Sequence, residues 1–196
     1  MRKFVYLISP KKISSNFYND LHKVLAAKNV KFFQLRLKKI KVKETIQIVK
    51  KIRKILKKYS VKLIINDNPY IAKITNADGC HLGQKDGSIL NAKKYLKRQI
   101  VGVTCHNSKT FAKIAIRNKA DYLAFGSFNK SKLKPKAKKA NINILKWAKR
   151  NIKKPIVAIG GIKGSNYKKF IKFGAKYIAI SSYIWDNPKL KPEIAI

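Results

Sequence analysis

Acidic residues are scarce in this sequence. Its 196 residues include only 8 Asp and Glu against 47 Lys and Arg, which gives a formal net charge of +39. Three of the eight, Asp67, Asp78 and Asp86, fall within residues 61–86, where two short apolar runs each end in polar residues. A carboxylate at the carboxyl end of a buried strand is well placed to hold a divalent cation. We therefore expect this stretch to form one wall of a functional site.

Cysteine and long apolar runs are also nearly absent. Cys80 and Cys105 are the only cysteines, and they lack the spacing of a disulfide framework, which favours a reducing cytoplasm. No apolar run is long enough to span a bilayer, and the first residues lack the features of a signal peptide. We expect a soluble, cytoplasmic protein with no membrane partner, built as one compact domain. A homo-oligomer is compatible with these features.

The excess of positive charge has two interpretations. Lys and Arg neutralise phosphates in nucleic-acid-binding proteins. However, all but six of the 47 basic residues are lysine, and it is arginine that reads bases bidentately. The lysines are also spread over every predicted helix rather than gathered in a tail. We therefore expect solvated helix surface and no specific nucleic-acid partner, with weak non-specific binding at low salt.

Short apolar runs alternate with amphipathic stretches along the whole chain. The predicted strands are residues 4–9, 30–37, 61–66, 80–82, 99–105, 122–125, 155–159 and 177–180. The predicted helices are residues 16–28, 43–59, 70–75, 88–96, 108–118, 142–150 and 166–173, with a stub of helix before residue 196. Nearly continuous apolar strands are typical of a parallel sheet covered on both faces. Eight such units predict an α/β fold, a (β/α)8 TIM barrel in a single domain; a doubly wound open sheet is the alternative.

Helical spacing also predicts which side chains face the core. In the helix over residues 108–118, it places Phe111, Ile114 and Ala115 inward.

Polar residues collect where the predicted strands end, and in a (β/α)8 barrel these ends meet at one rim that carries the chemistry. The candidates in chain order are Gln34, Arg36, Lys38, Asn66, Asp67, His81, Gln84, Asp86, Thr104, His106, Ser131, Lys134, Gly160, Gly161, Ser181 and Ser182. We expect them to form one site.

Residue types at this rim predict two phosphate-binding zones. Asp67 and Asp86 are hard oxygen donors that suit Mg²⁺ together with water and a phosphate. Arg36 and Lys38 supply positive charge for phosphate oxygens, and Gln34 is a neutral donor. The pairs at 160–161 and 181–182, after the last two strands, match a phosphate site made of backbone N–H groups. Two zones suggest two phosphorylated substrates.

Simpler interpretations stay open for several of these residues. The glycine pair alone is compatible with a tight turn. Asp67 alone is equally compatible with capping the next helix, and Asp78 favours a turn. Cys80 and His81 are adjacent in a strand and face opposite ways, which argues against zinc. His81 and His106 are better explained as hydrogen-bonding groups in the pocket.

Six sequence blocks together resemble thiamine-phosphate synthase. They are Q-L-R-L-K (34–38), I-I-N-D (64–67), D-G-C-H-L-G-Q-K-D (78–86), G-V-T-C-H (102–106), A-D-Y-L-A-F-G (120–126) and V-A-I-G-G-I (157–162). The resemblance covers nearly the whole chain in order. It implies a (β/α)8 barrel that joins a hydroxymethylpyrimidine diphosphate to a thiazole phosphate with Mg²⁺, releasing pyrophosphate after a dissociative step.

The resemblance also implies a role for individual residues. Asp67 and Asp86 would bind Mg²⁺, while Arg36, Lys38 and Lys134 would assist catalysis. Gln34, Arg36, Lys38 and Asn66 would hold the pyrimidine diphosphate, with Thr104 near the pyrophosphate, and Gly161 with Ser181 would cradle the thiazole phosphate.

The chain departs from the family pattern in the loop after the sixth predicted strand. Residues 126–134 read G-S-F-N-K-S-K-L-K, where the family usually has Pro-Thr followed by Thr-x-Lys. This departure affects the roles expected for residues on the thiazole side of the site, which include Ser131 and Lys134. Two alternative functions remain at this point: a thiazole tautomerase on the same barrel, which has little use for a metal–diphosphate site, and a basic nucleic-acid-binding protein.

Overall fold

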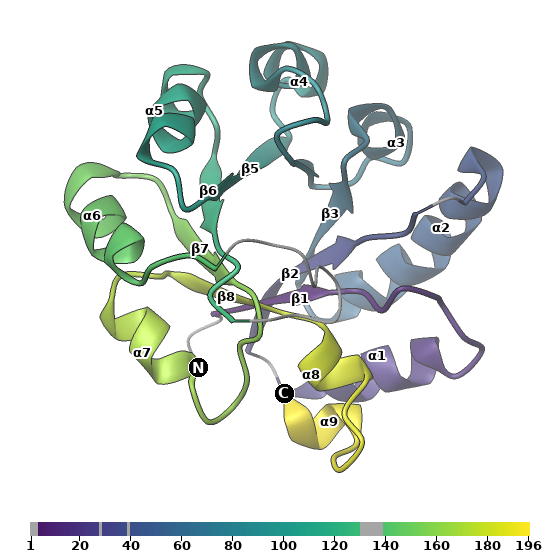
Figure 1. The fold of residues 1–196 in the computed structure, drawn as a ribbon. Helices are drawn as coiled ribbons and strands as arrows, with labels where there is room; N and C mark the ends of the chain where they lie inside the picture. The colour runs from purple at the N-terminus through teal and green to yellow at the C-terminus, as the bar shows by residue number, and fades with distance from the viewer. Residues whose placement is uncertain (1–3, 28, 39, 130–138) are drawn as a thin grey trace.

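A closed barrel of eight parallel strands forms the centre of the protein, with helices around it (Figure 1). The computed structural model describes residues 4–27, 29–38, 40–129 and 139–196. Neighbouring strands pair in sequence order, and the last strand pairs with the first. The predicted (β/α)8 fold is therefore confirmed, and the open-sheet alternative is wrong.

Strands and helices alternate as the apolar pattern predicts. The strands are β1 (Val5–Ile8), β2 (Val30–Leu35), β3 (Lys62–Asn66), β4 (Gly79–Leu82), β5 (Ile100–His106), β6 (Tyr122–Phe125), β7 (Ile156–Ile159) and β8 (Tyr177–Ile180). The helices are α1 (Phe17–Ala26), α2 (Val42–Lys58), α3 (Pro69–Ile74), α4 (Ile89–Leu96), α5 (Lys109–Arg117), α6 (Asn143–Asn151), α7 (Tyr167–Lys172), α8 (Ser182–Trp185) and α9 (Pro192–Ala195).

Alternation along each strand divides the core into an inner and an outer part. On β6, Tyr122 and Ala124 point into the barrel, whereas Leu123 and Phe125 pack outward against helices. The same rule on β4 sends Cys80 outward and His81 inward. The outer part carries most of the apolar side chains, so the barrel interior is free to hold polar groups near its rim.

Helix starts follow the local sequence. Ser88 and Ser108 each precede a helix, and their hydroxyl oxygens accept from the backbone N–H of Asn91 and Phe111 at 3.3 and 3.1 Å. These caps set where α4 and α5 leave the loops that follow β4 and β5, and so they help to position the rim.

The inward face of α5 differs from the prediction. Ala112 and Ala115 are fully buried, whereas Phe111 and Ile114 are 37% and 43% exposed. The small alanine side chains are the ones that pack against the barrel, and the Phe111 ring instead lies 6.4 Å from the His106 ring at the rim. The prediction was wrong for these two residues because periodicity alone does not choose between two partly apolar faces.

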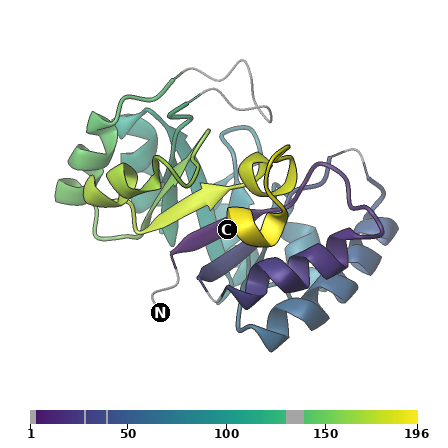
Figure 2. The ribbon, with the colours of Figure 1, turned by 90° about the horizontal axis from the view of Figure 1, so that it is seen from below.

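The segment after β8 returns to the start of the barrel, seen from below in Figure 2. The Trp185 indole N–H donates to the Ile8 carbonyl at 2.6 Å, and α9 packs beside α1. Two short helices replace the single stub predicted here. Within the described residues, no helix has the length and apolar character needed to cross a membrane.

Candidate active site

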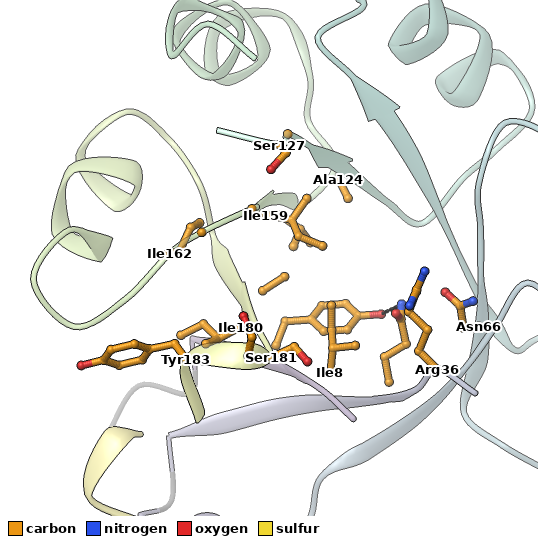
Figure 3. A pocket seen from close by; sticks show the side chains of 18 of the residues that line it. Ile8, Arg36, Asn66, Ala124, Ser127, Ile159, Ile162, Ile180, Ser181 and Tyr183 are labelled. Atoms are coloured by element: carbon orange, nitrogen blue, oxygen red, sulfur yellow. Dashed lines mark hydrogen bonds between the residues drawn. The ribbon is translucent and has the colours of Figure 1, made fainter. Parts of the chain in front are cut away.

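A cavity of about 540 Å³ opens at the carboxyl ends of the strands (Figure 3). Thirteen of the sixteen predicted site residues line it: Gln34, Arg36, Lys38, Asn66, Asp67, His81, Asp86, Thr104, His106, Gly160, Gly161, Ser181 and Ser182. Gln84 is not part of the lining, and its side-chain amide donates to the Thr104 carbonyl. Ser131 and Lys134 lie outside the described residues. Arg36 and Asn66 stand at one end of the cavity in Figure 3, while Ile162 and Tyr183 stand toward the other, with Ser181 between them.

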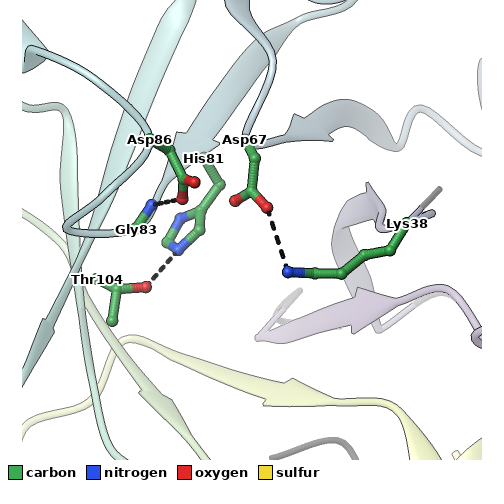
Figure 4. A network of polar contacts seen from close by, with 6 residues as sticks. All are labelled: Lys38, Asp67, His81, Gly83, Asp86 and Thr104. Atoms are coloured by element: carbon green, nitrogen blue, oxygen red, sulfur yellow. Dashed lines mark hydrogen bonds and ion pairs between the residues drawn. The ribbon is translucent and has the colours of Figure 1, made fainter. Parts of the chain in front are cut away.

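Asp67 and Asp86 face one another at the first end (Figure 4). Asp67 follows β3 directly and has a left-handed backbone with φ of 62°, held by its N–H donating to the His81 carbonyl at 2.8 Å. Asp86 is fixed by its own loop, because its Oδ2 accepts from the Gly83 N–H at 2.7 Å. Two separate loops thus bring the two carboxyl groups within hydrogen-bonding reach.

This pairing changes the acidity of Asp67. Partial burial raises the pKa of its carboxyl group from 3.8 to about 6, and the hydrogen bond and negative charge of Asp86 act in the same direction. The positive charges of Lys38 and Arg36 oppose the rise. Two carboxyl groups this close repel one another when both are charged, and a cation between them would relieve that repulsion.

Lys38 extends from the loop after β2 toward the carboxylate pair. Its Nζ lies 3.9 Å from Asp67 Oδ2, and the lysine side chain is 60% exposed (Figure 4). An exposed ion pair of this length is weak. The ammonium group is therefore available to a phosphate that enters the cavity.

The two carboxylates fit Mg²⁺ if the remaining ligands come from elsewhere. Among the described residues, no group of three or more His, Cys, Asp or Glu side chains could hold a metal ion. Mg²⁺ is commonly bound through one or two carboxylates, with waters and substrate phosphates completing the octahedron. The donor set of Asp67 and Asp86 matches that pattern.

The structure also decides two of the simpler interpretations. Asn68, not Asp67, caps α3, because its side-chain oxygen accepts from the Ile71 N–H at 2.9 Å. The capping interpretation of Asp67 is therefore wrong. Asp78 accepts from the Leu63 N–H at 2.8 Å just before β4, so it joins β4 to β3 at the opposite end of the barrel from the cavity.

The second end of the cavity is built from the turn after β7. Gly160 and Gly161 have φ of 110° and 58°, and a side chain at Gly160 would collide with Ser127. The Gly160 carbonyl accepts from the Asn129 backbone N–H at 3.1 Å, and the Gly161 carbonyl accepts from Asn129 Nδ2 at 3.2 Å. In a trans peptide unit, the C=O of one residue and the N–H of the next point in opposite directions. Since Asn129 holds both carbonyl groups, the N–H group that follows each of them points away from Asn129.

Those N–H groups belong to Gly161 and Ile162, which both line the cavity. Neither donates a hydrogen bond to any described residue. Ser181, at the end of β8, is anchored through its hydroxyl, which donates to the Ser9 carbonyl at 3.1 Å. This end therefore offers backbone donors that no described residue uses, of the kind that bind a phosphate.

Sequence reasoning missed part of the cavity wall. Tyr6 lies on its floor, Ser127 stands at its edge, and Tyr183 lines it from the segment after β8. Tyr6 belongs to a continuous apolar run, in which nothing marks the inward positions. The only available signal was strand alternation: Tyr6 lies two residues before Ile8, so both side chains face the same side of the strand.

Three comparisons with known proteins agree. A family model described as thiamine monophosphate synthase matches residues 5–184. The thiamine-phosphate synthase of Pelagibacter ubique is 56% identical over 196 residues, which is 100% of this chain and 95% of the relative. That of Erythrobacter litoralis is 38% identical, covering 93% of this chain and 88% of the relative.

A solved structure gives the same result. Thiamine phosphate pyrophosphorylase from Pyrococcus furiosus superposes with a TM-score of 0.87 at 26% identity, covering 98% of this chain and 91% of that one. The family match spans all eight strands and both ends of the cavity. This chain therefore belongs to the thiamine monophosphate synthase family.

Proposed function

We propose that this enzyme joins 4-amino-5-hydroxymethyl-2-methylpyrimidine diphosphate to a thiazole phosphate, forming thiamine phosphate and releasing pyrophosphate. Family membership supports the reaction, and the single observation that carries it is the pair of carboxyl groups, Asp67 and Asp86, beside Lys38. A diphosphate with a divalent cation is the ligand that such a cluster of mixed charge would take.

Asp67 and Asp86 would hold the cation at the diphosphate end. When bound, Mg²⁺ would neutralise the negative charge that grows on the departing pyrophosphate. Arg36 and Lys38 add positive charge for the phosphate oxygens, and Lys38 would exchange its weak contact with Asp67 for them. Gln34 and Asn66, which line the same end, would orient the pyrimidine diphosphate, with Thr104 near the pyrophosphate.

The proposed reaction is dissociative. The C–O bond to the diphosphate breaks and the electron pair leaves with pyrophosphate. The thiazole nitrogen then donates its lone pair to the resulting pyrimidine-stabilised cation. Such a cation must be protected from water, and the wall between the two ends is apolar, formed by Ile8, Ala124, Val157 and Ile159. No general base or protein nucleophile is needed.

The thiazole phosphate would occupy the end near the glycine turn. The N–H groups of Gly161 and Ile162, which donate to no described residue, support this assignment, together with Gly160, Ser181 and Ser182 in the wall. We also assign Ser131 and Lys134 to the binding of the thiazole phosphate, on the basis of their positions in the sequence alone.

The remaining proposals concern the cellular compartment of the enzyme, its partners and the two alternative functions. We propose a reducing cytoplasm, supported by two free buried cysteines, Cys80 and Cys105. We propose that the barrel acts as one domain on small phosphorylated substrates. A thiazole tautomerase is disfavoured because it would not need the carboxylate pair with Lys38. A nucleic-acid function is disfavoured because the aromatic residues are scattered along the sequence and the lysines are spread over the helices, whereas such a function needs basic and aromatic residues gathered together.

The test is an assay with both substrates and Mg²⁺. We expect thiamine phosphate and pyrophosphate to appear in equal amounts, only when both substrates and the metal are present. Isomerisation of a thiazole carboxylate phosphate without pyrophosphate release would support the tautomerase instead. Absence of both products, from protein shown to be folded, would contradict the proposal.

A further inference from the structure

A chain of hydrogen bonds crosses the interior of the barrel beneath the cavity. Gln34 Nε2 donates to the Tyr6 hydroxyl at 3.0 Å, and that hydroxyl lies 2.6 Å from the hydroxyl of Tyr122. The Tyr122 hydroxyl lies 2.9 Å from His81 Nδ1, and His81 Nε2 lies 2.8 Å from Thr104 Oγ1. Five strands contribute one residue each, and both ends of the chain reach the cavity wall.

Tyr122 is the central member, and it does not line the cavity. Its ring stacks on the His81 imidazole with centroids 5.6 Å apart and an interplanar angle of 16°. Space for the ring depends on Gly102, because a side chain at that position would overlap the phenol. Tyr6 and Tyr122 are each only 2% exposed, so water does not compete for their hydroxyl groups.

The need to pair each buried hydroxyl proton gives the hydrogen bonds one preferred direction. Gln34 donates to Tyr6, and the Tyr6 hydroxyl is only 2% exposed, so donation to Tyr122 is the arrangement that leaves its buried proton paired. The proton of Tyr122 then goes to His81 Nδ1, which acts as an acceptor. A neutral imidazole with an acceptor at Nδ1 carries its proton on Nε2, and so it donates to Thr104.

Thr104 is left with its own hydroxyl proton to give. Its oxygen already accepts from His81, and no acceptor in the described part of the chain takes the proton. Thr104 lines the same end of the cavity as Asp67 and Asp86, as Figure 4 shows. The hydroxyl therefore presents a donor to whatever acceptor enters there.

Both phenols keep their protons under all ordinary conditions. Burial raises the pKa of Tyr6 and of Tyr122 well above the usual value for a phenol. The two hydroxyl protons that the hydrogen bonds between Gln34 and Thr104 require are therefore always present.

We propose that Tyr122 is a positioning residue that holds His81 in the Nε2–H form and thereby makes the Thr104 hydroxyl a donor toward the diphosphate. The identity of that acceptor rests on the proposed function, whereas the tautomer and the direction of the chain do not. The opposite direction would put the proton on Nδ1 and oblige Thr104 to donate to His81, with no proton left for a ligand.

Nitrogen-15 NMR of the imidazole rings tests the direction without any substrate. The chain has three histidines, and spectra of His22→Gln and His106→Gln variants leave the His81 signals assigned by elimination. We expect His81 in the substrate-free enzyme to be neutral, with the proton on Nε2. A proton on Nδ1 would overturn the proposal, whether or not the enzyme makes thiamine phosphate.

The variant Tyr122→Phe tests the positioning role. It removes one buried hydroxyl and keeps the ring, and we expect His81 to lose its fixed tautomer and kcat to fall about tenfold. Tyr6→Phe should weaken the same tautomer preference, while Tyr95→Phe, on the exposed surface of α4, should change neither the spectrum nor the rate. An unchanged His81 tautomer in Tyr122→Phe would overturn the proposal even if activity fell.

Discussion

At the scale of single residues, a carboxyl group at the end of a buried strand is subject to opposing effects, and Asp67 experiences both. Burial and the neighbouring Asp86 favour its protonated form, while Lys38 and Arg36 favour the carboxylate. The balance puts its pKa at about 6, where a cation and a proton compete near neutral pH. If Asp67 is a Mg²⁺ ligand as proposed, it should bind the metal above that pH and lose it below.

Carbon-13 NMR of the aspartate carboxyl groups should detect this balance. Without Mg²⁺, we expect Asp67 to titrate with a midpoint of about 6. Because its pKa is higher when folded than its ordinary value of 3.8, its contribution to stability is present below about pH 4 and is lost as pH rises through about 6. Millimolar Mg²⁺ should therefore raise Tm more at pH 7.5 than at pH 5, and an equal shift at both would count against the metal site.

Asp86→Asn should lower turnover about 100-fold or more, since it removes one of two proposed metal ligands. It should also bring the pKa of Asp67 down, because the negative charge of Asp86 is lost. Asp20→Asn, in the first turn of α1 and remote from the cavity, is the matched control. Steady-state kinetics over a Mg²⁺ series would check this, and full activity of Asp86→Asn would exclude Asp86 as an essential ligand.

At the scale of secondary-structure elements, the ends of β6 and β7 depend on each other. Asn129, four residues after the last residue of β6, holds the carbonyl groups of both Gly160 and Gly161 after β7. Asn166 Nδ2 also donates to the Gly161 carbonyl, at 3.2 Å. The glycine turn is therefore held in one conformation by side chains from two loops.

Asn129→Ala should loosen the glycine turn. We expect KM for the thiazole phosphate to rise about five- to tenfold, because two side-chain hydrogen bonds are lost, while KM for the pyrimidine diphosphate stays the same. Asn151→Ala removes a comparable hydrogen bond, to the Trp147 carbonyl in α6, and serves as control. Equal increases in both KM values would show a general loss of structure rather than a local one.

Elements and strand ends could be predicted from the sequence, whereas the inner wall could not. Apolar runs bounded by polar residues located the strands, and the rim followed from barrel geometry. The prediction of which α5 side chains face the core was wrong for Phe111 and Ile114, because helical spacing does not distinguish their face from the face that carries the two buried alanines. Tyr6 and Tyr122 were missed because they are 116 residues apart and sit in uniformly apolar runs, where no pattern pairs them.

At the scale of the whole molecule, the protein carries a net charge of +39, and two of its eight acidic residues, Asp67 and Asp86, lie in the site. A positive surface draws anionic substrates toward the cavity, and it also attracts any polyanion. Among the described residues, Lys93 with Asp121 forms an ion pair at 2.8 Å, and two further pairs are near 4 Å. Most of the lysine charge therefore has no acidic partner.

Binding to DNA should accordingly be weak and electrostatic. We expect duplexes of different sequence to bind equally at about 50 mM salt and to be released by about 200 mM. Fluorescence polarisation over a salt series would measure both properties. Sequence-specific binding that persists at the higher salt would favour a nucleic-acid function.

Anomalous diffraction from crystals grown with Mn²⁺ and pyrophosphate tests the central claim most directly, because it locates the metal and the diphosphate together. We predict one strong Mn²⁺ peak between the carboxyl groups of Asp67 and Asp86, with the pyrophosphate bound to it and within reach of Arg36 and Lys38. A metal bound elsewhere, or a pyrophosphate seated only at the glycine turn after β7, would contradict the account.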